Sequence, residues 1–409
     1  MNIWFLSPHE PPHGHTSRTY DYCQELIKLG HKVTIFTNSY SHRTHEELLG
    51  PREKFRIANV DGIRVVWLRT FHYTGNGWQR GINMFSFTRR ALAVAPTLDE
   101  KPAVVIGESV PPMAGWAAAR IAKSKGAAFV YQIRDVWPIA LVYDGGLSKW
   151  SPVYFTFRLI EKYLYRRAHH VCATMPFLSE HVRKSGGNPD KVTCVPNGVR
   201  LESYPDPRGY DGGIDRPLTV MYVGAFGVAH DVITIVRAAR ILKEKESSDF
   251  RFIIVGDGVK RRECEREAAA AGLTNVEFRA PVAKSDVPAL QADSDVLIAC
   301  VTDSPSYQFG INLNKLYDYF ASGRPVIFSG SAPNDPVAAS GAGFSIPPED
   351  PVAMAIALEK LAAMRPDERA ALGRRARAYA ETHFDVRKLA AVMEDILLKS
   401  VSDSLRTSD

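Results

Sequence analysis

A regular alternation of short apolar runs with helical patterns, repeated twice along the chain, is the feature that most constrains the fold. Apolar runs rich in Val, Ile, Phe and Tyr are typical of buried strands, and helices between such strands indicate βαβ units with a parallel sheet. In the first half, the pattern predicts strands at residues 2–7, 31–37, 63–68, 103–108, 127–133, 169–174 and 191–196, with helices near 17–29, 82–95, 114–124, 152–167 and 176–185. We expect a doubly wound α/β domain whose sheet is covered on both faces.

The alternation stops and then restarts. Residues 201–217 are rich in Pro and Gly and lack apolar periodicity, which is typical of a linker between domains. Beyond them, strands are predicted at 218–224, 251–256, 276–281, 295–301 and 325–330, with helices near 231–245, 259–271, 313–322 and 350–363. We therefore expect two Rossmann-like domains, over residues 1–200 and 218–385. A last helix near 386–400 has no strand after it and must pack on an element already built.

The charge of the chain is distributed unevenly between its halves. Residues 1–200 carry 26 Lys and Arg against 15 Asp and Glu, whereas residues 201–409 carry 25 against 30. The basic half indicates an anionic partner, either a phosphate-bearing substrate or a membrane surface. Five scattered cysteines without a CxxC pair predict reduced thiols and a cytoplasmic protein. No run of about 18 apolar residues predicts a transmembrane helix.

Ligands of open parallel sheets bind beyond the carboxyl ends of the strands. The first such loop, residues 7–18, offers Gly14 for close backbone approach and a helix N-terminus near Thr16 for an anion. The spacing of its His9, His13 and His15 does not fit a tetrahedral metal site, and we expect one of them to orient a substrate hydroxyl. Neither half has the G-x-G-x-x-G of a dehydrogenase, and there is no P-loop or nucleophile elbow.

The most informative segment is FGINLNKLYDYFASGRPVIFSG, residues 309–330. Gly310 precedes a helix expected to begin near Asn312, whose first N–H groups and dipole favour a diphosphate. Lys315 adds a positive charge on the first turn, and Asp318 can accept hydrogen bonds from the two hydroxyls of a ribose. The alternative, an i,i+3 surface pair of Lys315 and Asp318, stays open on spacing alone.

Seven segments in order carry a resemblance to a known family: SPHEPPHGHTSRTYDYCQELIKLGHKVTIFTN, QIRDVWP, KVTCVPNGV, YVGAFG, GDG, VEFRAPV and NKLYDYFASGRPVI. Together they resemble the family 4 glycosyltransferases of GT-B fold, in the bacterial branch that builds O-antigen and capsule. The resemblance implies two Rossmann-like domains facing a cleft, with the first domain completed by residues 386–409. It also implies a nucleotide-sugar donor, first of all a UDP-sugar, on the second domain and a glycan or lipid-diphosphate-linked acceptor on the first. Transfer would retain the anomeric configuration, with no cofactor or metal.

The resemblance also implies roles for individual residues. Asp318 corresponds to the acid that binds the ribose, Pro281 and Val282 run beside the base, and Asn197–Gly198 form a hinge turn. The remaining expected donor-binding residues are Gly310, Ile311, Asn312, Asn314, Gly224, His230 and Gly256; the acceptor-binding residues are Gly14, His15 and Arg18; and the catalytic residues are Lys315, Arg134 and Asp135.

The chain departs from the family pattern at three places. Arg134 replaces the His of a His-Asp pair, Gly310 stands where the first acid of a spaced pair is usual, and the Arg and Lys that clamp the diphosphate are missing after the strand 218–224. His230 is the nearby candidate that remains. We therefore expect Lys315, the helix N-terminus and Arg134 to neutralise the diphosphate.

Other interpretations remain open at this point. Residues 147–170 interleave aromatic and basic side chains, as does segment 77–90, which fits either a core helix with a solvated face or a peripheral contact with an anionic membrane. The DSD at 293–295 is read as a turn, not as a metal site. A nucleotide-sugar epimerase of the same fold and a non-catalytic nucleotide-sugar-binding protein are the alternative functions. No nucleic-acid-binding motif is present.

Overall fold

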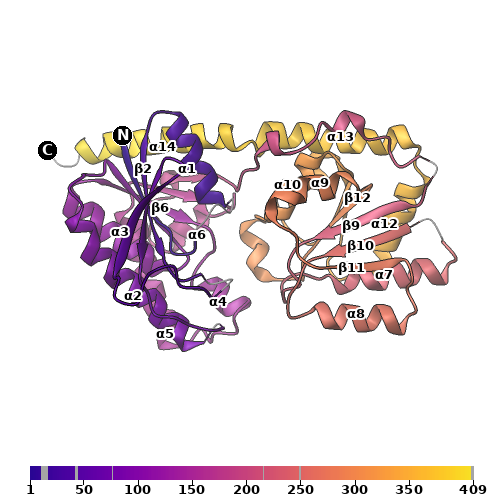
Figure 1. Cartoon of the computed structure of the whole chain (residues 1–409), viewed down its shortest axis with the longest axis horizontal. Coiled ribbons are helices and arrows are strands. Elements are labelled where there is room, and N and C mark those ends of the chain that lie inside the picture. The colour runs from indigo at the N-terminus through magenta and orange to yellow at the C-terminus, as the bar shows by residue number, and fades with distance from the viewer. Residues whose placement is uncertain (11–16, 42–44, 76, 215, 248–249, 407–409) are drawn as a thin grey trace. The chain divides into compact units, whose positions relative to one another are not determined.

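The computed structural model describes residues 1–10, 17–41, 45–75, 77–214, 216–247 and 250–406, which fold into two compact α/β units (Figure 1). The first unit comprises Met1–Pro196 together with Val386–Asp409, and the second comprises Asn197–Asp385. The sequence placed the division a few residues later, after Arg200. In the described ranges, every helix is too short or too polar to cross a bilayer.

The segment expected to be a linker, residues 201–217, is anchored on the second unit. The Tyr204 hydroxyl donates to Asp318 Oδ1 at 2.7 Å, and the Tyr210 hydroxyl donates to the carbonyl of Asp295 at 3.1 Å. A Cβ on Gly323 would lie 2.3 Å from that of Pro207, so the segment also packs closely against the end of a helix. Pro and Gly therefore mark irregular backbone here, and the tyrosines between them attach it to the unit.

The first unit is built on an eight-stranded sheet in the order β3-β4-β2-β1-β5-β6-β7-β8. Its strands are β1 (Asn2–Leu6), β2 (Lys32–Asn38), β3 (Phe55–Val60), β4 (Ile63–Leu68), β5 (Val104–Glu108), β6 (Ala128–Ile133), β7 (His170–Ala173) and β8 (Val192–Cys194). Its helices are α1 (Arg18–Lys28), α2 (Trp78–Val94), α3 (Pro112–Lys125), α4 (Ile139–Tyr143), α5 (Pro152–Arg167), α6 (Ser179–Lys184) and α14 (Val386–Arg406). The predicted strands are confirmed, with ends that differ by one or two residues.

The sequence predicts a parallel sheet in the first unit, but one strand at its edge is antiparallel. Strand β3, which was not predicted, pairs antiparallel with β4, and Asp61 and Gly62 at positive φ form the tight turn between them. Its side chains alternate between exposed and half-buried positions, because it lies at the edge of the sheet. An edge strand needs few apolar residues, so the pattern of buried strands did not reveal it.

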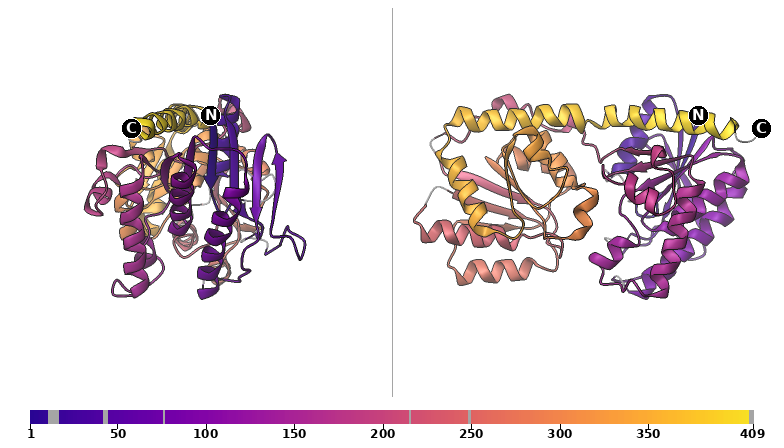
Figure 2. Two further views of the ribbon diagram at one scale, coloured as in Figure 1. Left: turned by 90° about the vertical axis from the view of Figure 1, so that its left-hand side faces the viewer. Right: turned by 180° about the vertical axis from the view of Figure 1, so that it is seen from behind.

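Helices cover both faces of the first sheet (Figure 2). Alternate residues of the central strands, such as Ile3 and Phe5, pack with α1 and α14 into one apolar cluster. Side chains on the opposite face, such as Trp4, lie toward α2 and α3. Helix α14 contributes Ala390, Met393 and Leu397 to the first cluster, and all three are fully buried. The last helix thus packs on the first unit, as the absence of a following strand required.

The second unit has a six-stranded parallel sheet in the order β11-β10-β9-β12-β13-β14. Its strands are β9 (Leu218–Val223), β10 (Phe250–Val255), β11 (Val276–Arg279), β12 (Val296–Cys300), β13 (Val326–Ser329) and β14 (Gly343–Ile346). Its helices are α7 (Ile233–Glu244), α8 (Arg261–Ala270), α9 (Val287–Ala292), α10 (Asn314–Ser322), α11 (Pro336–Ser340), α12 (Pro351–Ala363) and α13 (Pro366–His383). Strand β14 and the short helices α9 and α11 were not predicted.

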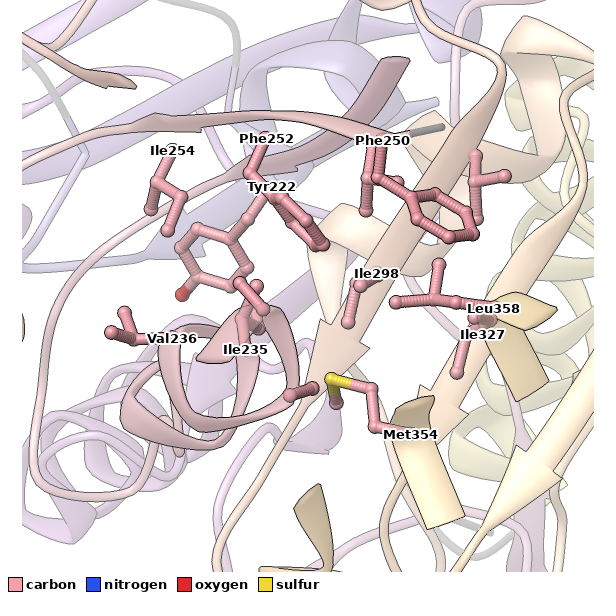
Figure 3. Close-up of a cluster of buried hydrophobic side chains, with 14 of the residues drawn as sticks. Tyr222, Ile235, Val236, Phe250, Phe252, Ile254, Ile298, Ile327, Met354 and Leu358 are labelled. Carbon is pink, nitrogen blue, oxygen red and sulfur yellow. The ribbon is translucent and has the colours of Figure 1, made fainter. Parts of the chain in front are cut away.

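Two apolar clusters hold this second sheet, one on each face. On one face, Tyr222, Phe252 and Ile298 of the strands meet Ile235 of α7 and Met354 of α12, as Figure 3 shows. On the other face, the second cluster joins α10 and α13 to the sheet. Because both faces are covered, the carboxyl ends of the strands are where backbone and polar groups reach solvent.

Candidate active site

Two buried carboxylates and one guanidinium meet at the carboxyl edge of the first sheet. Strands β1, β5 and β6 are neighbours, so Glu10 after β1, Glu108 at the end of β5 and Arg134 after β6 come together. Arg134 Nη1 lies 3.4 Å from Glu108 Oε2 and 3.8 Å from Glu10 Oε1. Glu108 also accepts hydrogen bonds from Thr19 at 2.8 Å and from Gln132 at 3.1 Å.

The charges of this cluster depend on one another. Burial, and next the nearby charge of Glu108, raise the pKa of Glu10. Burial opposes the charge of Arg134, but Glu108 and then Glu10 outweigh it and raise the pKa of this guanidinium. Glu108 and Glu10 therefore keep Arg134 in its charged form and hold its guanidinium at the carboxyl edge of the sheet.

Asp135 follows Arg134 in the loop after β6. Ser109 holds this loop, because its hydroxyl donates to the carbonyl of Asp135 at 2.9 Å and accepts from the N–H of Arg134 at 3.0 Å. The Asp135 side chain reaches solvent but is closely surrounded by protein. This desolvation raises the pKa of its carboxyl group, against the opposing charge of Arg134.

The expected acceptor-binding residues are only partly described. Gly14 and His15 lie outside the described residues. Arg18 is buried, with its guanidinium 4.4 Å from the centre of the Tyr22 ring and its Nη2 donating to the carbonyl of Val195 at 2.7 Å. These contacts attach Arg18 to the chain after β8, and its part in acceptor binding stays a prediction.

In the second unit, glycines let two loops approach backbone to backbone. A Cβ on Gly256, at φ +141°, would lie 1.8 Å from the carbonyl oxygen of Gly224, and one on Gly258 would lie 2.6 Å from that of Phe226. Only glycine fits at such distances and dihedral angles. The loops after β9 and β10 are thus held together, and glycine is needed at positions 256 and 258 for this contact.

Lys315 lies beside Gly224. A Cβ on that glycine would be 3.1 Å from Lys315 Nζ, which donates to the Tyr222 hydroxyl at 2.7 Å and lies 4.2 Å from the centre of the Tyr222 ring. Burial lowers the pKa of Lys315 to about 8. The ammonium group is thus held at the carboxyl end of β9. Among the described residues no carboxylate forms an ion pair with it, so a bound anion would stabilise its charged form.

His230, the candidate that remains where the clamp residues are missing, is held in its neutral form in this structure. Burial, and next the charge of Lys315, lower its pKa to about 4. Burial first, and the neighbouring charge of Lys315 second, therefore favour the neutral imidazole. His230 keeps the capacity to donate a hydrogen bond, and its place in the donor site stays a prediction.

The backbone donors expected before α10 are also corrected. The N–H of Gly310 donates to the carbonyl of Tyr307 at 2.9 Å, and that of Ile311 donates to Asn334 Oδ1 at 2.6 Å. The helix begins at Asn314, two residues later than predicted, and Leu313 before it has no side-chain oxygen with which to cap it. The diphosphate donors are therefore to be sought in the first turn of α10, at Asn314 and Lys315, and not at Gly310 and Ile311.

Asn312 and Asn314 hold the start of the second unit. The Oδ1 atom of Asn312 accepts from the N–H of Asn197 at 3.3 Å and from the Tyr317 hydroxyl at 2.6 Å, and Asn314 Oδ1 accepts from the Asn197 side chain. The expected hinge turn at Asn197–Gly198 is thus tied directly to the N-terminus of α10. These two asparagine side chains therefore serve the chain itself in this structure.

Asp318 lies one helical turn after Lys315, with both carboxylate oxygens engaged. The Tyr204 hydroxyl donates to Oδ1 at 2.7 Å, and Lys284 Nζ forms an ion pair with Oδ2. Burial, and next Asp318, raise the pKa of Tyr204 well above its usual value. Lys284 comes from the loop after β11, in which Pro281 and Val282 are exposed. Lys315 and Asp318 therefore lie in two different environments and do not form a surface ion pair with each other.

Several residues of this arrangement were not predicted from the sequence. Tyr222, Tyr204 and Lys284 approach α10 from distant parts of the chain, and no local pattern marks them. Glu108 was included only as the last residue of a predicted strand, although an acid at the buried end of a strand is itself a signal of function.

The described side chains can be searched for groups that could bind a metal ion. No three His, Cys, Asp or Glu side chains in the described ranges gather as a metal site. Within the DSD segment, Asp295 is fully buried, pairs with Arg216 and accepts from the N–H of Thr219 at 2.8 Å. These contacts give Asp295 a structural role before strand β12, in agreement with its interpretation as a turn residue.

Two family models match adjoining parts of the chain. Residues 13–198 match the Glycosyl transferase 4-like domain, and residues 217–364 match Glycosyl transferases group 1. A curated relative, "Probable glycosyltransferase WbjE" of Pseudomonas aeruginosa, is 23% identical over 248 residues. That match covers 58% of this chain and 60% of the relative.

Solved structures share the architecture over the whole chain. Sucrose-phosphate synthase of Thermosynechococcus elongatus has a TM-score of 0.74 at 18% identity, with 100% of both chains covered. HepE of Anabaena in complex with UDP-glucose has a TM-score of 0.66 at 15% identity, again with 100% of both chains covered. The two matched domains and the two α/β units agree with these folds: the chain has the GT-B fold, and each of its two units matches a glycosyltransferase domain.

Proposed function

We propose that this protein transfers a sugar from a nucleotide-sugar, first of all a UDP-sugar, to a glycan or lipid-linked acceptor with retention of configuration, in the synthesis of a bacterial surface polysaccharide. The observation that carries the proposal is the placement of Lys315 against Gly224. A half-buried lysine that reaches the end of β9, together with the first turn of α10 on which it lies, suits a diphosphate. The complex of HepE with UDP-glucose supports a donor of this class.

Each unit would carry one part of the reaction. In the second unit, Asp318 would accept the ribose hydroxyls and Lys315 would stabilise the charge that develops on the leaving diphosphate. In the first unit, Arg134 and Asp135 are the proposed catalytic residues. The bond from the anomeric carbon to the diphosphate oxygen would break as the acceptor oxygen bonds to that carbon on the same face, and the hydroxyl proton would pass to the leaving diphosphate oxygen. No protein nucleophile is then required.

A ligand screen followed by a product assay tests this function. A nucleotide or nucleotide-sugar at 100 times its dissociation constant stabilises the fold by about 2.7 kcal/mol, so thermal unfolding in a panel of nucleotide-sugars identifies the donor. Incubation with that donor alone separates the alternatives, because an epimerase alters the donor without an acceptor. A protein that binds the donor but yields neither transfer nor hydrolysis with any glycan or lipid-linked acceptor would contradict the proposal.

We predict that sugar transfer continues in excess EDTA. Lys315 and the helix N-terminus would stabilise the negative charge on the leaving diphosphate, so the reaction would require no bound divalent ion. The measurement is the initial rate of transfer with and without chelator, at fixed ionic strength. A rate that falls to background and returns with magnesium or manganese would refute this prediction.

We also propose that the first unit contacts the inner face of the membrane. Trp150 and Leu159 of the α5 region are 86% and 69% exposed, and Trp78 and Phe85 of α2 are 74% and 58% exposed. Lys149, Lys162 and Arg166 flank the α5 side chains and suit anionic headgroups. Arg158 of the same stretch instead donates to Glu161 at 2.9 Å and to Ser185 at 3.0 Å.

Vesicle binding is expected to depend on both the apolar and the basic residues of this surface. Each Lys or Arg near an anionic surface contributes about 1 kcal/mol, so binding should rise with anionic lipid and fall with salt. A variant with Trp150→Ala, Lys149→Ala and Lys162→Ala should lose binding in a cosedimentation assay yet keep its donor affinity. Val352→Ser, at an exposed apolar residue of α12, is the matched control. Wild-type protein that ignores anionic vesicles at low salt would contradict the membrane contact.

A further inference from the structure

Asp318 is held by two groups that differ in their freedom to leave. Tyr204 is 7% exposed, and its hydroxyl donates to Oδ1 from inside the second unit. The Lys284 side chain is 46% exposed and reaches Oδ2 from the loop after β11. Exposed ion pairs are weak, and lysine carries its charge on a flexible four-carbon stem. Tyr204 is therefore a permanent partner of Asp318, whereas Lys284 is replaceable.

A ribose that binds Asp318 needs the position that Lys284 occupies. Its hydroxyls would donate to the carboxylate, and Oδ2 is the oxygen whose present partner can withdraw into solvent. Lys315 lies one helical turn before Asp318 on α10. An ammonium group released from Asp318 has a flexible four-carbon stem with which to reach toward that turn. A diphosphate bound at Lys315 would then offer Lys284 a new anionic partner.

A diphosphate at this place also calls for further positive charge. His230 is neutral above about pH 4, and the N–H groups of Gly310 and Ile311 already have partners inside the protein. Arg261 donates to the carbonyl of Gly256, but it is paired with Glu265 at 2.7 Å. Lys315 therefore carries the positive charge that no carboxylate among the described residues balances at this site, against a ligand with at least two negative charges. Lys284 is the nearby cation whose present bond can be exchanged.

We propose that Lys284 is a second nucleotide-binding cation that closes Asp318 in the empty protein and moves to the diphosphate when ribose takes its place. This inference rests on the proposed role of Asp318 as the ribose ligand. Lys284 acts in two opposite ways. It competes with the ribose of any nucleoside, and it attracts the phosphates of a nucleoside diphosphate.

The opposite effects make the proposal testable with two probes, UDP and uridine. Lys284→Ala should weaken UDP binding about tenfold, because it removes a charge-assisted contact with phosphate. The same variant should bind uridine as tightly as wild type or up to about fivefold more tightly, because it removes a competitor of surface-pair strength. Lys284→Arg should keep the affinity for UDP within a few fold. Titration calorimetry measures both ligands, with competition against UDP for weak uridine binding.

Lys245→Ala is the matched control, because Lys245 is 48% exposed and pairs with Glu359 at 3.0 Å on another surface of the same unit. It should change neither affinity. Equal losses of UDP and uridine affinity in Lys284→Ala would show a structural role and overturn the inference, as would unchanged UDP affinity. Wild-type protein that binds none of UDP, GDP and ADP would instead refute the proposed function, and the inference with it.

Discussion

Replacement of Lys315 by alanine is expected to lower kcat by about 10²–10³-fold, the effect seen when one preorganised donor to a developing negative charge is removed. Lys315 Nζ is held by Tyr222 and lies against Gly224, so its position is set before the donor binds. Charge on the leaving diphosphate grows toward the transition state, and the loss should therefore appear more in kcat than in donor affinity.

The pH profile provides an independent check on Lys315. Burial lowers its pKa to about 8, so the free protein loses this positive charge as the pH rises above that value. The value of kcat/KM reports the free enzyme and should fall above about pH 8, whereas kcat should hold to higher pH because the bound diphosphate favours the ammonium form. Lys315→Arg, if active, should lack this alkaline fall, since a guanidinium stays charged.

Two results would contradict this role of Lys315. One is an equal loss in donor affinity and in kcat/KM with kcat unchanged, which would indicate ground-state binding alone. The other is an alkaline fall that persists in Lys315→Ala with wild-type amplitude. Lys243→Ala provides the control, because Lys243 is an exposed lysine of α7 that donates to the carbonyls of Ala271 and Gly272.

Replacement of Asp318 by alanine is expected to weaken binding of the nucleoside diphosphate by about 10–100-fold. A hydrogen bond to a charged group contributes about 1.5–3 kcal/mol, and the carboxylate would accept from the ribose. The loss should be nearly the same for the nucleoside and for its diphosphate, because the contact involves the sugar. Calorimetry with UDP and uridine measures both.

The structure shows which control this experiment needs. Asp318→Ala also leaves the buried Tyr204 hydroxyl without its acceptor and should lower stability, so the unfolding temperature must be measured alongside. Tyr204→Phe removes the same internal hydrogen bond but keeps the carboxylate, and it should retain most of the nucleotide affinity. A folded Asp318→Ala protein with unchanged affinity would remove Asp318 from the site.

The fold was largely predictable because its signals are local. Strands such as 63–68 and helices such as 152–167 have the predicted bounds. Burial on both faces of a parallel sheet imposes a continuous apolar run on a strand, and the periodicity of apolar residues and the capping residue mark a helix. Edge strand β3 and the short β14 were missed, because half-exposed strands need no such run. The site was less predictable, as His230 and Gly310 illustrate.

The sequence by itself determined that two α/β domains follow one another and that Lys315 and Asp318 lie a turn apart on one helix, because period and spacing act over a few residues. Only the tertiary structure decided what these side chains meet. Tyr222 reaches Lys315 from 93 residues away, and Tyr204 and Lys284 reach Asp318 from 114 and 34 residues away. Charge state and availability depend on such partners and on burial, which the fold creates by bringing distant segments together, and no local pattern encodes them.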